Sequence, residues 1–276
     1  MPRPDSVGSP RKKRERPDYK MSASDGRRFT VLRNSACLEI LVNDIFYMLS
    51  ARADNNIGHE NLMTEQWTAV TGADAHAVQV RDAIARHRRE GDRIIVGNWA
   101  DSTLLAGESY DTVLADYLLG AIDGFAPYFQ HRLFTRLRPL VRRRLYVVGL
   151  EPYVVGEPDS EAGRLVWEIG RFRDACLLLA GEHPYREYPS QWVVDHLEAS
   201  GYRIIAAKRF ANRYKERFVN SQIDMCAPRL ARIADRGLAD ALAARGEALR
   251  AEALALVASA NGLRHGFDYI LAAEPA

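Results

Sequence analysis

Gly72 and Asp74 form the pair of residues whose chemistry is clearest. They lie in "AVTGADAHAVQV" (69–80), where an apolar, strand-like run ends and a helical pattern begins. A carboxylate at a strand end can accept hydrogen bonds from both hydroxyls of a ribose, and a glycine there lets a neighbouring loop approach closely. The alternative is that Asp74 only caps the following helix, as aspartate often does.

A second pair, Asn98 and Trp99, follows the next apolar run in "VGNWADSTL" (96–104). In a sheet that binds adenine, a polar side chain at this place faces the exocyclic amine, so Asn98 is a candidate for that contact. Trp99 would then flank the ring. The alternative is that Trp99 is an ordinary core aromatic.

Further candidates end the later strands. Asp116 and Tyr117 end the strand part of "YDTVLADYLL" (110–119), and Glu151 lies near the end of "RLYVVGLEPY" (144–153). Ligands of open parallel sheets bind outside the carboxyl ends of the strands, so we expect these side chains to face one.

A Pro-bounded segment, "EHPYREYP" (182–189), adds ionisable and aromatic groups, namely His183, Tyr185, Glu187 and Tyr188. Such a segment suits a small organic ligand, although it could equally pack the loop against the sheet. Tyr117, Glu151 and His183 are our candidates for a catalytic base, with His59 as a rival.

The elements that position these groups alternate along the chain. Strand-like runs occupy 37–42, 67–74, 91–99, 110–119, 144–153, 202–210 and 267–275, and helical patterns occupy 45–53, 75–90, 125–141, 163–181, 190–201 and 236–262. Apolar strands separated by helices predict an α/β fold with a parallel sheet covered on both faces. In the last helix Leu238, Leu242, Leu249 and Leu256 share one face, and Ala253 is the weak point of that stripe.

Composition indicates a soluble globular protein: 276 residues, 47% hydrophobic and 27% charged. Residues 1–20 hold seven basic and three acidic residues and four prolines, which predicts a disordered basic tail. The rest of the chain gives no electrostatic case for binding nucleic acid. No apolar run is long enough to span a bilayer, and the three separated cysteines predict reduced, buried thiols, so we expect a cytoplasmic protein.

Several of these segments together resemble the class I S-adenosylmethionine-dependent methyltransferases. "VTGAD" is similar to that family's "VxGVD", "VGNWADSTL" to its "GDxxxLP", and "YDTVLADYLL" to its "FDxVxxxxxL". The resemblance covers about 36–275 and implies a Rossmann-like sheet whose last strand is inserted antiparallel. One methyltransferase-like domain over 21–276 follows, with a helical insertion at 211–262 that is a candidate surface for a homodimer or a protein partner.

The resemblance also assigns a role to the first strand and turn. The family has an acid followed by glycines at alternate positions, and "EILVNDI" overlays that motif from Glu39. Glu39 would support the loop or the methionine amine, whereas Leu41, Asn43 and Ile45 stand where glycines belong. Asn43 tolerates the left-handed backbone that glycine provides, and Leu41 adds a side chain beside the methionine moiety.

Two functional hypotheses follow. The first is a methyltransferase that uses S-adenosylmethionine on a small organic molecule, with in-line methyl transfer governed by positioning. The second is a methyltransferase-like protein that has lost the cofactor and acts as a partner or regulatory subunit. No phosphate loop, nucleophile elbow or metal-ligand spacing supports another chemistry, and we expect no metal.

Overall fold

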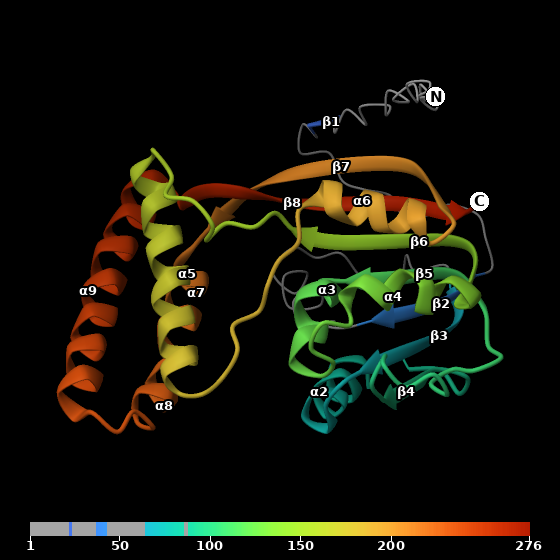
Figure 1. Cartoon of the computed structure of the whole chain (residues 1–276), viewed down its shortest axis with the longest axis horizontal. Helices are drawn as coiled ribbons and strands as arrows, with labels where there is room; N and C mark the ends of the chain where they lie inside the picture. The colour runs from blue at the N-terminus through green and yellow to red at the C-terminus, as the bar shows by residue number, and fades with distance from the viewer. Residues whose placement is uncertain (1–21, 24–36, 43–63, 86–87) are drawn as a thin grey trace, which may run out of the picture.

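The computed structural model describes residues 22–23, 37–42, 64–85 and 88–276, with side chains from Gln66 onward. In these ranges the strands form one sheet in the order β1-β7-β8-β6-β5-β2-β3-β4 (Figure 1). The strands are β1 (Ser22–Ala23), β2 (Cys37–Val42), β3 (Thr64–Thr71), β4 (Arg93–Val96), β5 (Tyr110–Asp116), β6 (Val141–Leu150), β7 (Tyr202–Tyr214) and β8 (Leu263–Pro275).

The strand directions confirm the predicted architecture. β4, β3, β2, β5 and β6 pair in parallel, and β8 lies antiparallel between β6 and β7. β2 is the central parallel strand, with Glu39 opposite Trp67 and Thr112. The first predicted strand is therefore confirmed, whereas the turn after it lies outside the described residues.

Helices cover both faces of the parallel strands. They are α2 (Asp74–Ile84), α3 (Leu118–Ala121), α4 (Gln130–Leu137), α5 (Glu161–Leu179), α6 (Ser190–Ala199), α7 (Glu216–Asp224), α8 (Ala227–Leu230) and α9 (Arg236–Ala260), with 3-10 turns η2 (Ile122–Gly124) and η3 (Arg138–Leu140). Successive residues of β3 point to opposite faces: Ala69 packs with Val80 and Ile84 of α2, and Val70 belongs to the core on the other face.

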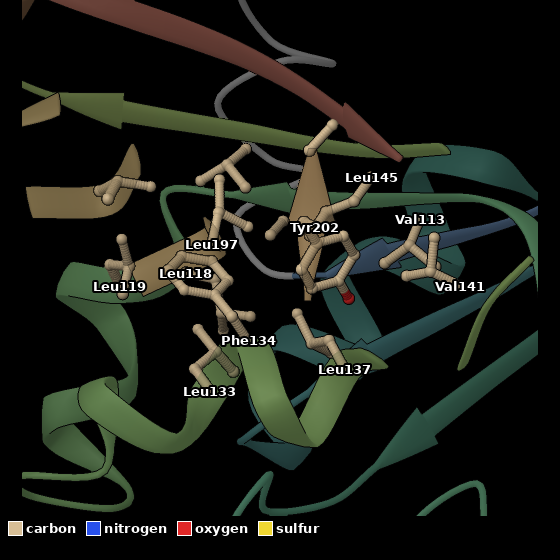
Figure 2. Packing of buried hydrophobic residues seen from close by; sticks show 14 of the residues in the cluster. Val113, Leu118, Leu119, Leu133, Phe134, Leu137, Val141, Leu145, Leu197 and Tyr202 are labelled. Carbon is tan, nitrogen blue, oxygen red and sulfur yellow. The ribbon is translucent and has the colours of Figure 1, made fainter. Parts of the chain in front are cut away.

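That larger core joins α3, α4 and α6 to the sheet (Figure 2). Leu133, Phe134 and Leu137 of α4 are almost fully buried. Burial of each such side chain stabilises the fold by about 1.5–3 kcal/mol, so this core fixes α3 and the strand ends next to it.

A second core holds the helices at the other end of the molecule, where α5 and α9 lie side by side (Figure 1). Leu249 and Ala253 of α9 are buried in it, and Leu242 and Leu256 pack against it. The apolar stripe of α9 is thus largely used within the chain. Leu238 stays exposed, and Ala253 is a buried contact rather than a weak point.

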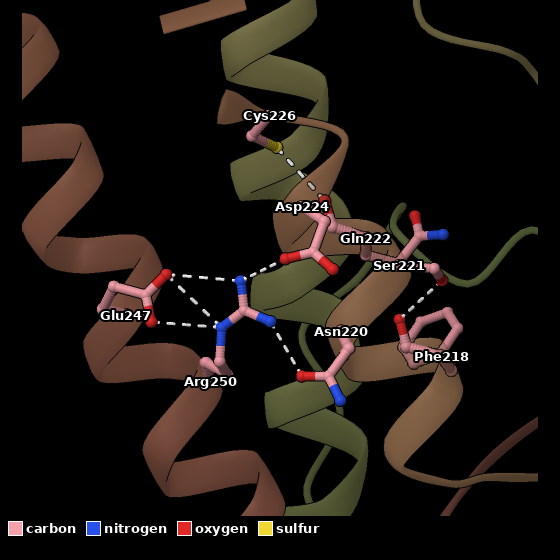
Figure 3. A network of polar contacts seen from close by, with 8 residues as sticks. All are labelled: Phe218, Asn220, Ser221, Gln222, Asp224, Cys226, Glu247 and Arg250. Atoms are coloured by element: carbon pink, nitrogen blue, oxygen red, sulfur yellow. Dashed lines mark hydrogen bonds and ion pairs between the residues drawn. The ribbon is translucent and has the colours of Figure 1, made fainter. Parts of the chain in front are cut away.

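Polar contacts fasten α7 to α9 (Figure 3). Arg250 donates to Asn220 at 2.8 Å, to Asp224 at 2.7 Å and to Glu247 in its own helix. Two of the three predicted buried thiols occur at the same end, since Cys176 and Cys226 are free, buried and in contact with each other, whereas the side chain of Cys37 is not among those described. None of the helices in the described ranges has the length and apolar character to cross a membrane.

The antiparallel pair β7 and β8 is longer than predicted, with 13 residues in each strand. Pairing continues from Ala211 opposite Phe267 to Tyr214 opposite Leu263. Polar residues such as Arg213 and Arg264 hid this extension in the sequence. An antiparallel ladder pairs backbone groups whatever the polarity of the side chains, so the strands run on.

Candidate functional site

The carboxyl ends of the parallel strands meet at one edge of the sheet. β3 ends at Thr71, β4 at Val96, β5 at Asp116 and β6 at Leu150. The predicted groups of the 72–74, 98–99, 116–117 and 151 segments therefore lie along this edge, as expected for a ligand site in an open α/β sheet.

Gly72 and Asn98 bound a small slot at the β3–β4 part of the edge. A β-carbon on Gly72 would lie 2.7 Å from the ring of Phe125, so the missing side chain makes room for a flat aromatic ring. The Asn98 amide donates to the Phe125 carbonyl at 2.6 Å and accepts from the Ala100 amide at 2.9 Å. With Phe125 in place, a cavity of only about 20 Å³ is left.

Trp99 is a core aromatic, as the alternative reading predicted, and its contact with adenine stays a prediction. It is 5% exposed and belongs to the main core, and it also lines the slot beside Asn98. The guanidinium of Arg136 stands 5.9 Å from its ring centre. The wall of the slot is therefore held by the core.

Asp74 is an exposed residue at the first position of α2. The N-cap residue of that helix is Ala73, and no side chain bonds to the cap. The carboxylate thus does not make the capping hydrogen bond that was the alternative to ligand binding. It remains available to a ligand at the end of β3.

Tyr117 marks the end of β5 with an unusual backbone. Its φ of 47° and ψ of 22° lie in the left-handed region, which costs a tyrosine about 1 kcal/mol or more. Its amide donates to Val148 at 3.0 Å, and its hydroxyl bonds to Asp268 of β8. Burial raises the pKa of Asp268, while the hydrogen bonds from Asn212 and Tyr117 oppose that rise. Asp116 beside it is buried.

Glu151 joins three elements just after β6. Its carboxylate accepts from the amide and hydroxyl of Ser190 at the start of α6, and it pairs with Arg209 of β7 at 2.8 Å. These contacts hold α6 and β7 against the end of β6. A base needs a free lone pair toward a substrate, and here the contacts favour a positioning role.

A cleft of about 470 Å³ opens beside this part of the edge. Its walls come from the segment after β6, from α5 and from the 182–189 segment, and they contain Pro152, Tyr153, Val154, Val155, Arg171, Arg173, Asp174, Ala175, Leu178, Tyr185, Arg186 and Glu187. A volume of this size suits a small organic molecule.

Arg173 lines the cleft and makes hydrogen bonds to three residues around it. It donates to the Tyr153 hydroxyl at 2.8 Å, to Gln222 at 3.0 Å and to Asp174 at 2.6 Å. Its guanidinium therefore ties α5 to α7 and to the segment after β6. Burial raises the pKa of Tyr153, against the opposing effect of Arg173.

Glu187 connects the cleft with the end of β5. Its Oε1 lies 3.2 Å from where a β-carbon on Gly120 would stand, so the glycine admits the carboxylate. Tyr185 similarly packs on Gly124, at 3.5 Å from that position. Burial raises the pKa of Glu187 to about 7, with Arg173 lowering it and Asp268 raising it.

Two solved structures resemble this chain over most of its length. One is a candidate methyltransferase from Bacillus halodurans C-125, with 10% sequence identity, a TM-score of 0.54, and coverage of 88% of this chain and 94% of that one. The other is a cyclopropane-fatty-acyl-phospholipid synthase-like protein from Lactobacillus casei ATCC 334, with 12% identity, a TM-score of 0.54, and coverage of 87% and 84%. No protein-family model and no curated protein matches the sequence.

The chain has the class I methyltransferase fold. The sequence resemblance implied S-adenosylmethionine as the cofactor, and the slot allows a test of whether the residues present fit it. Gly72 leaves room for a flat aromatic ring, and Asp74 stands nearby with an exposed carboxylate. These features fit an adenosine, provided that the ring of Phe125, which is 38% exposed, turns out of the slot.

The methyltransferase fold brings most of the predicted site residues to one edge, but not all. His183 is exposed and is not among the residues that line the cleft. For Glu39 and Leu41 the structure gives only the backbone position in β2, and Asn43 and His59 lie outside the described residues. In the described part of the chain, no group of three His, Cys, Asp or Glu could hold a metal ion.

Several residues of this edge were not singled out by sequence reasoning. The predicted helical pattern at 125–141 includes Phe125, whereas the helix of the structure begins at Gln130 and leaves Phe125 before it. Arg173 lay inside a long helical pattern, and Asp268 inside the last strand. Glu187 was noted only as part of the 182–189 segment. A polar residue within an apolar strand, such as Asp268, was the one available signal.

Proposed function

We propose that this protein is a methyltransferase that uses S-adenosylmethionine to methylate a small organic molecule. One observation carries the proposal: Gly72 opens an aromatic-ring-sized slot next to the uncommitted carboxylate of Asp74, at the carboxyl edge of this sheet. A ring slot and a carboxylate that follow the same strand end would suit the base and the ribose of an adenosine.

Several residues would hold the cofactor. The Asp74 carboxylate would accept hydrogen bonds from the ribose hydroxyls, and Asn98 and Trp99 would border the adenine. Glu39 and Asn43, of the first strand and turn, would face the methionine part. When bound, the cofactor would supply an electrophilic methyl group to a lone pair of the acceptor, and its sulfur would keep the electron pair of the carbon–sulfur bond.

The remaining work of this chain is orientation. Because the chemistry is a displacement, most of the rate would come from holding the acceptor in line. Tyr117 lies at the end of β5, its backbone fixed by the bond to Val148 and its hydroxyl by Asp268. A rigid phenol there can border the reacting atoms. The cleft of about 470 Å³ supports a small-molecule acceptor.

Isothermal titration calorimetry tests the proposal directly. The wild-type protein should bind S-adenosylmethionine and S-adenosylhomocysteine. Asp74→Ala should weaken both by roughly 100-fold, because two hydrogen bonds to a charged group are lost. Asp82→Ala, on the exposed face of the same helix, is the matched control and should leave the affinity unchanged.

Two results would count against the proposal or a part of it. Absence of heat and of a thermal shift at millimolar ligand would remove it and favour the second hypothesis, a non-catalytic partner protein. Binding that is unaffected by Asp74→Ala would remove the ribose contact from the proposal but leave the cofactor in place.

A further inference from the structure

The cleft combines apolar walls with an excess of positive charge. Val154, Val155 and Leu178 supply aliphatic surface, and Val155 and Leu178 are more than half exposed. Three guanidinium groups, from Arg171, Arg173 and Arg186, face two carboxylates, from Asp174 and Glu187. The cleft is therefore net positive even with both acids ionised.

These arginines differ in how they are held. Arg173 is anchored by its bonds to Tyr153, Asp174 and Gln222. Arg186 approaches Asp174 only at 3.5 Å and is more than half exposed. Arg171 stacks on Trp167 at 4.8 Å and forms no ion pair with a carboxylate of the described residues. Arg171 and Arg186 can thus turn to an incoming anion at little cost.

Glu187 stands at the inner end of the same cleft. Its carboxylate interacts electrostatically with Arg173 of α5, with Asp268 and Tyr269 of β8, and with Tyr153 of the segment after β6. It also reaches Gly120, two residues past Leu118 and next to the β5 end. Among the described groups of the cleft, it alone is an ionisable acid placed toward the strand edge.

We propose that this cleft binds a small, largely apolar methyl acceptor with one anionic group, held by Arg171 and Arg186, and that Glu187 takes the proton from its nucleophilic hydroxyl or amine. This inference rests on the proposed function. The acceptor's oxygen or nitrogen gains the methyl carbon and loses one proton, which goes to a Glu187 carboxylate oxygen. Near neutral pH Glu187 exists in both forms, so it can accept that proton and release it to water.

Carboxylate probes test the anion site without any need for catalysis. Calorimetry compares 4-hydroxybenzoate with 4-hydroxybenzamide, and hexanoate with hexanamide, each with and without S-adenosylhomocysteine. Each carboxylate should bind at least fivefold more tightly than its amide. The double variant Arg171→Ala, Arg186→Ala should remove that difference. Equal binding of acid and amide, or no binding of either acid, overturns the anion site.

A matched pair of variants locates the binding. Leu178 lines the cleft, and its neighbour Leu179 does not, although both are about half exposed. Leu178→Trp should block the probes, whereas Leu179→Trp should not. Equal effects of the two variants would place the probes elsewhere and overturn the site.

Proton counting tests Glu187. The binding enthalpy of 4-hydroxybenzoate at pH 7, measured in buffers of different ionisation enthalpy, gives the protons exchanged per ligand. The wild type should exchange a measurable fraction of a proton and Glu187→Gln none. Equal exchange by both overturns the role of Glu187. If S-adenosylhomocysteine binds and the carboxylate probes do not, only this inference fails. If the carboxylate probes bind and S-adenosylhomocysteine does not, only the proposed function fails.

Discussion

The two halves of the sheet edge differ in how much room they leave. At the β3–β4 end, the slot over Gly72 holds the ring of Phe125 and has only about 20 Å³ to spare. Beyond β6, the cleft around Arg173 offers about 470 Å³. The β3–β4 end, whose sequence resembles a cofactor-binding motif, is filled by the side chain of Phe125. The cleft beyond β6, which carries no such motif, is open.

The difference lies in what holds each wall. The slot is closed by one ring that is 38% exposed, and such a ring can move at modest cost. The cleft is lined by the largely buried guanidinium of Arg173, which bonds to three other residues. The closed slot can thus change shape by the movement of one side chain, whereas a change in the open cleft would require breaking several hydrogen bonds of Arg173.

Removing the Arg173 anchor should have the largest effect. Arg173→Met leaves Asp174 and the Tyr153 hydroxyl without their main partner, and breaking a buried pair costs about 3–5 kcal/mol. The free energy of unfolding from urea denaturation should fall by about 3 kcal/mol or more. The control Arg245→Met removes an exposed pair with Glu168 and should cost under about 1 kcal/mol. Equal losses would show that Arg173 is no anchor.

The raised pKa of Glu187 should make stability depend on pH. The unfolded glutamate ionises near its ordinary pKa, while the folded one stays protonated until about pH 7, so the wild type loses stability between these values. Glu187→Gln avoids that loss. The difference between the free energies of unfolding of the variant and the wild type should therefore grow by about 2–3 kcal/mol, in favour of the variant, from pH 4 to pH 8.

Urea denaturation across that pH range gives the measurement. Glu157→Gln, at an exposed site of the segment after β6, serves as the control. A difference between Glu187→Gln and the wild type that stays constant with pH would mean that the carboxylate of Glu187 is not desolvated in the cleft.

Filling the slot should block the cofactor. A β-carbon at Gly72 already meets the Phe125 ring at 2.7 Å, and valine would occupy the space that a base needs. Gly72→Val should weaken S-adenosylhomocysteine by about 100-fold, or roughly 2.7 kcal/mol. Calorimetry measures this, with Gly156→Val as the control because nothing lies within 4 Å of that site. Unchanged affinity would place the base elsewhere.

Emptying the slot should have the smallest effect and the opposite sign. If the ring of Phe125 competes with the base, Phe125→Ala removes the cost of displacing it, roughly 1–1.5 kcal/mol of apolar burial. S-adenosylhomocysteine should then bind about tenfold more tightly. A weaker complex would show instead that Phe125 packs on the ligand.

The sequence predicted the parallel sheet and its antiparallel last strand because apolar runs and helical patterns are local signals. It also predicted that Asp74 and Asn98 follow strand ends at the carboxyl edge of the sheet, because a strand end is a local feature. It did not predict that the Asn98 amide bonds to the Phe125 carbonyl, 27 residues away.

The cleft was harder to predict for the same reason. Arg173, Glu187 and Asp268 come from separate segments, and only the packing of α5 and β8 brings them together. In the sequence Arg173 and Asp268 look like ordinary charges on a helix and a strand, and Glu187 is one of several ionisable groups of the 182–189 segment. What a charge does depends on its neighbours, and those neighbours are distant in the chain.

The short segment from Leu118 to Phe125 touches both halves of the edge. Gly120 lies against the carboxylate of Glu187, Gly124 packs against the ring of Tyr185, and the ring of Phe125 fills the slot. A ligand that displaces Phe125 would therefore act on a wall of the cleft through this segment of eight residues. Binding of the cofactor and of the acceptor would then be thermodynamically linked, and the factor by which one ligand changes the affinity of the other would be the same in both directions. Measuring both affinities, each with and without the other ligand, would give that factor twice.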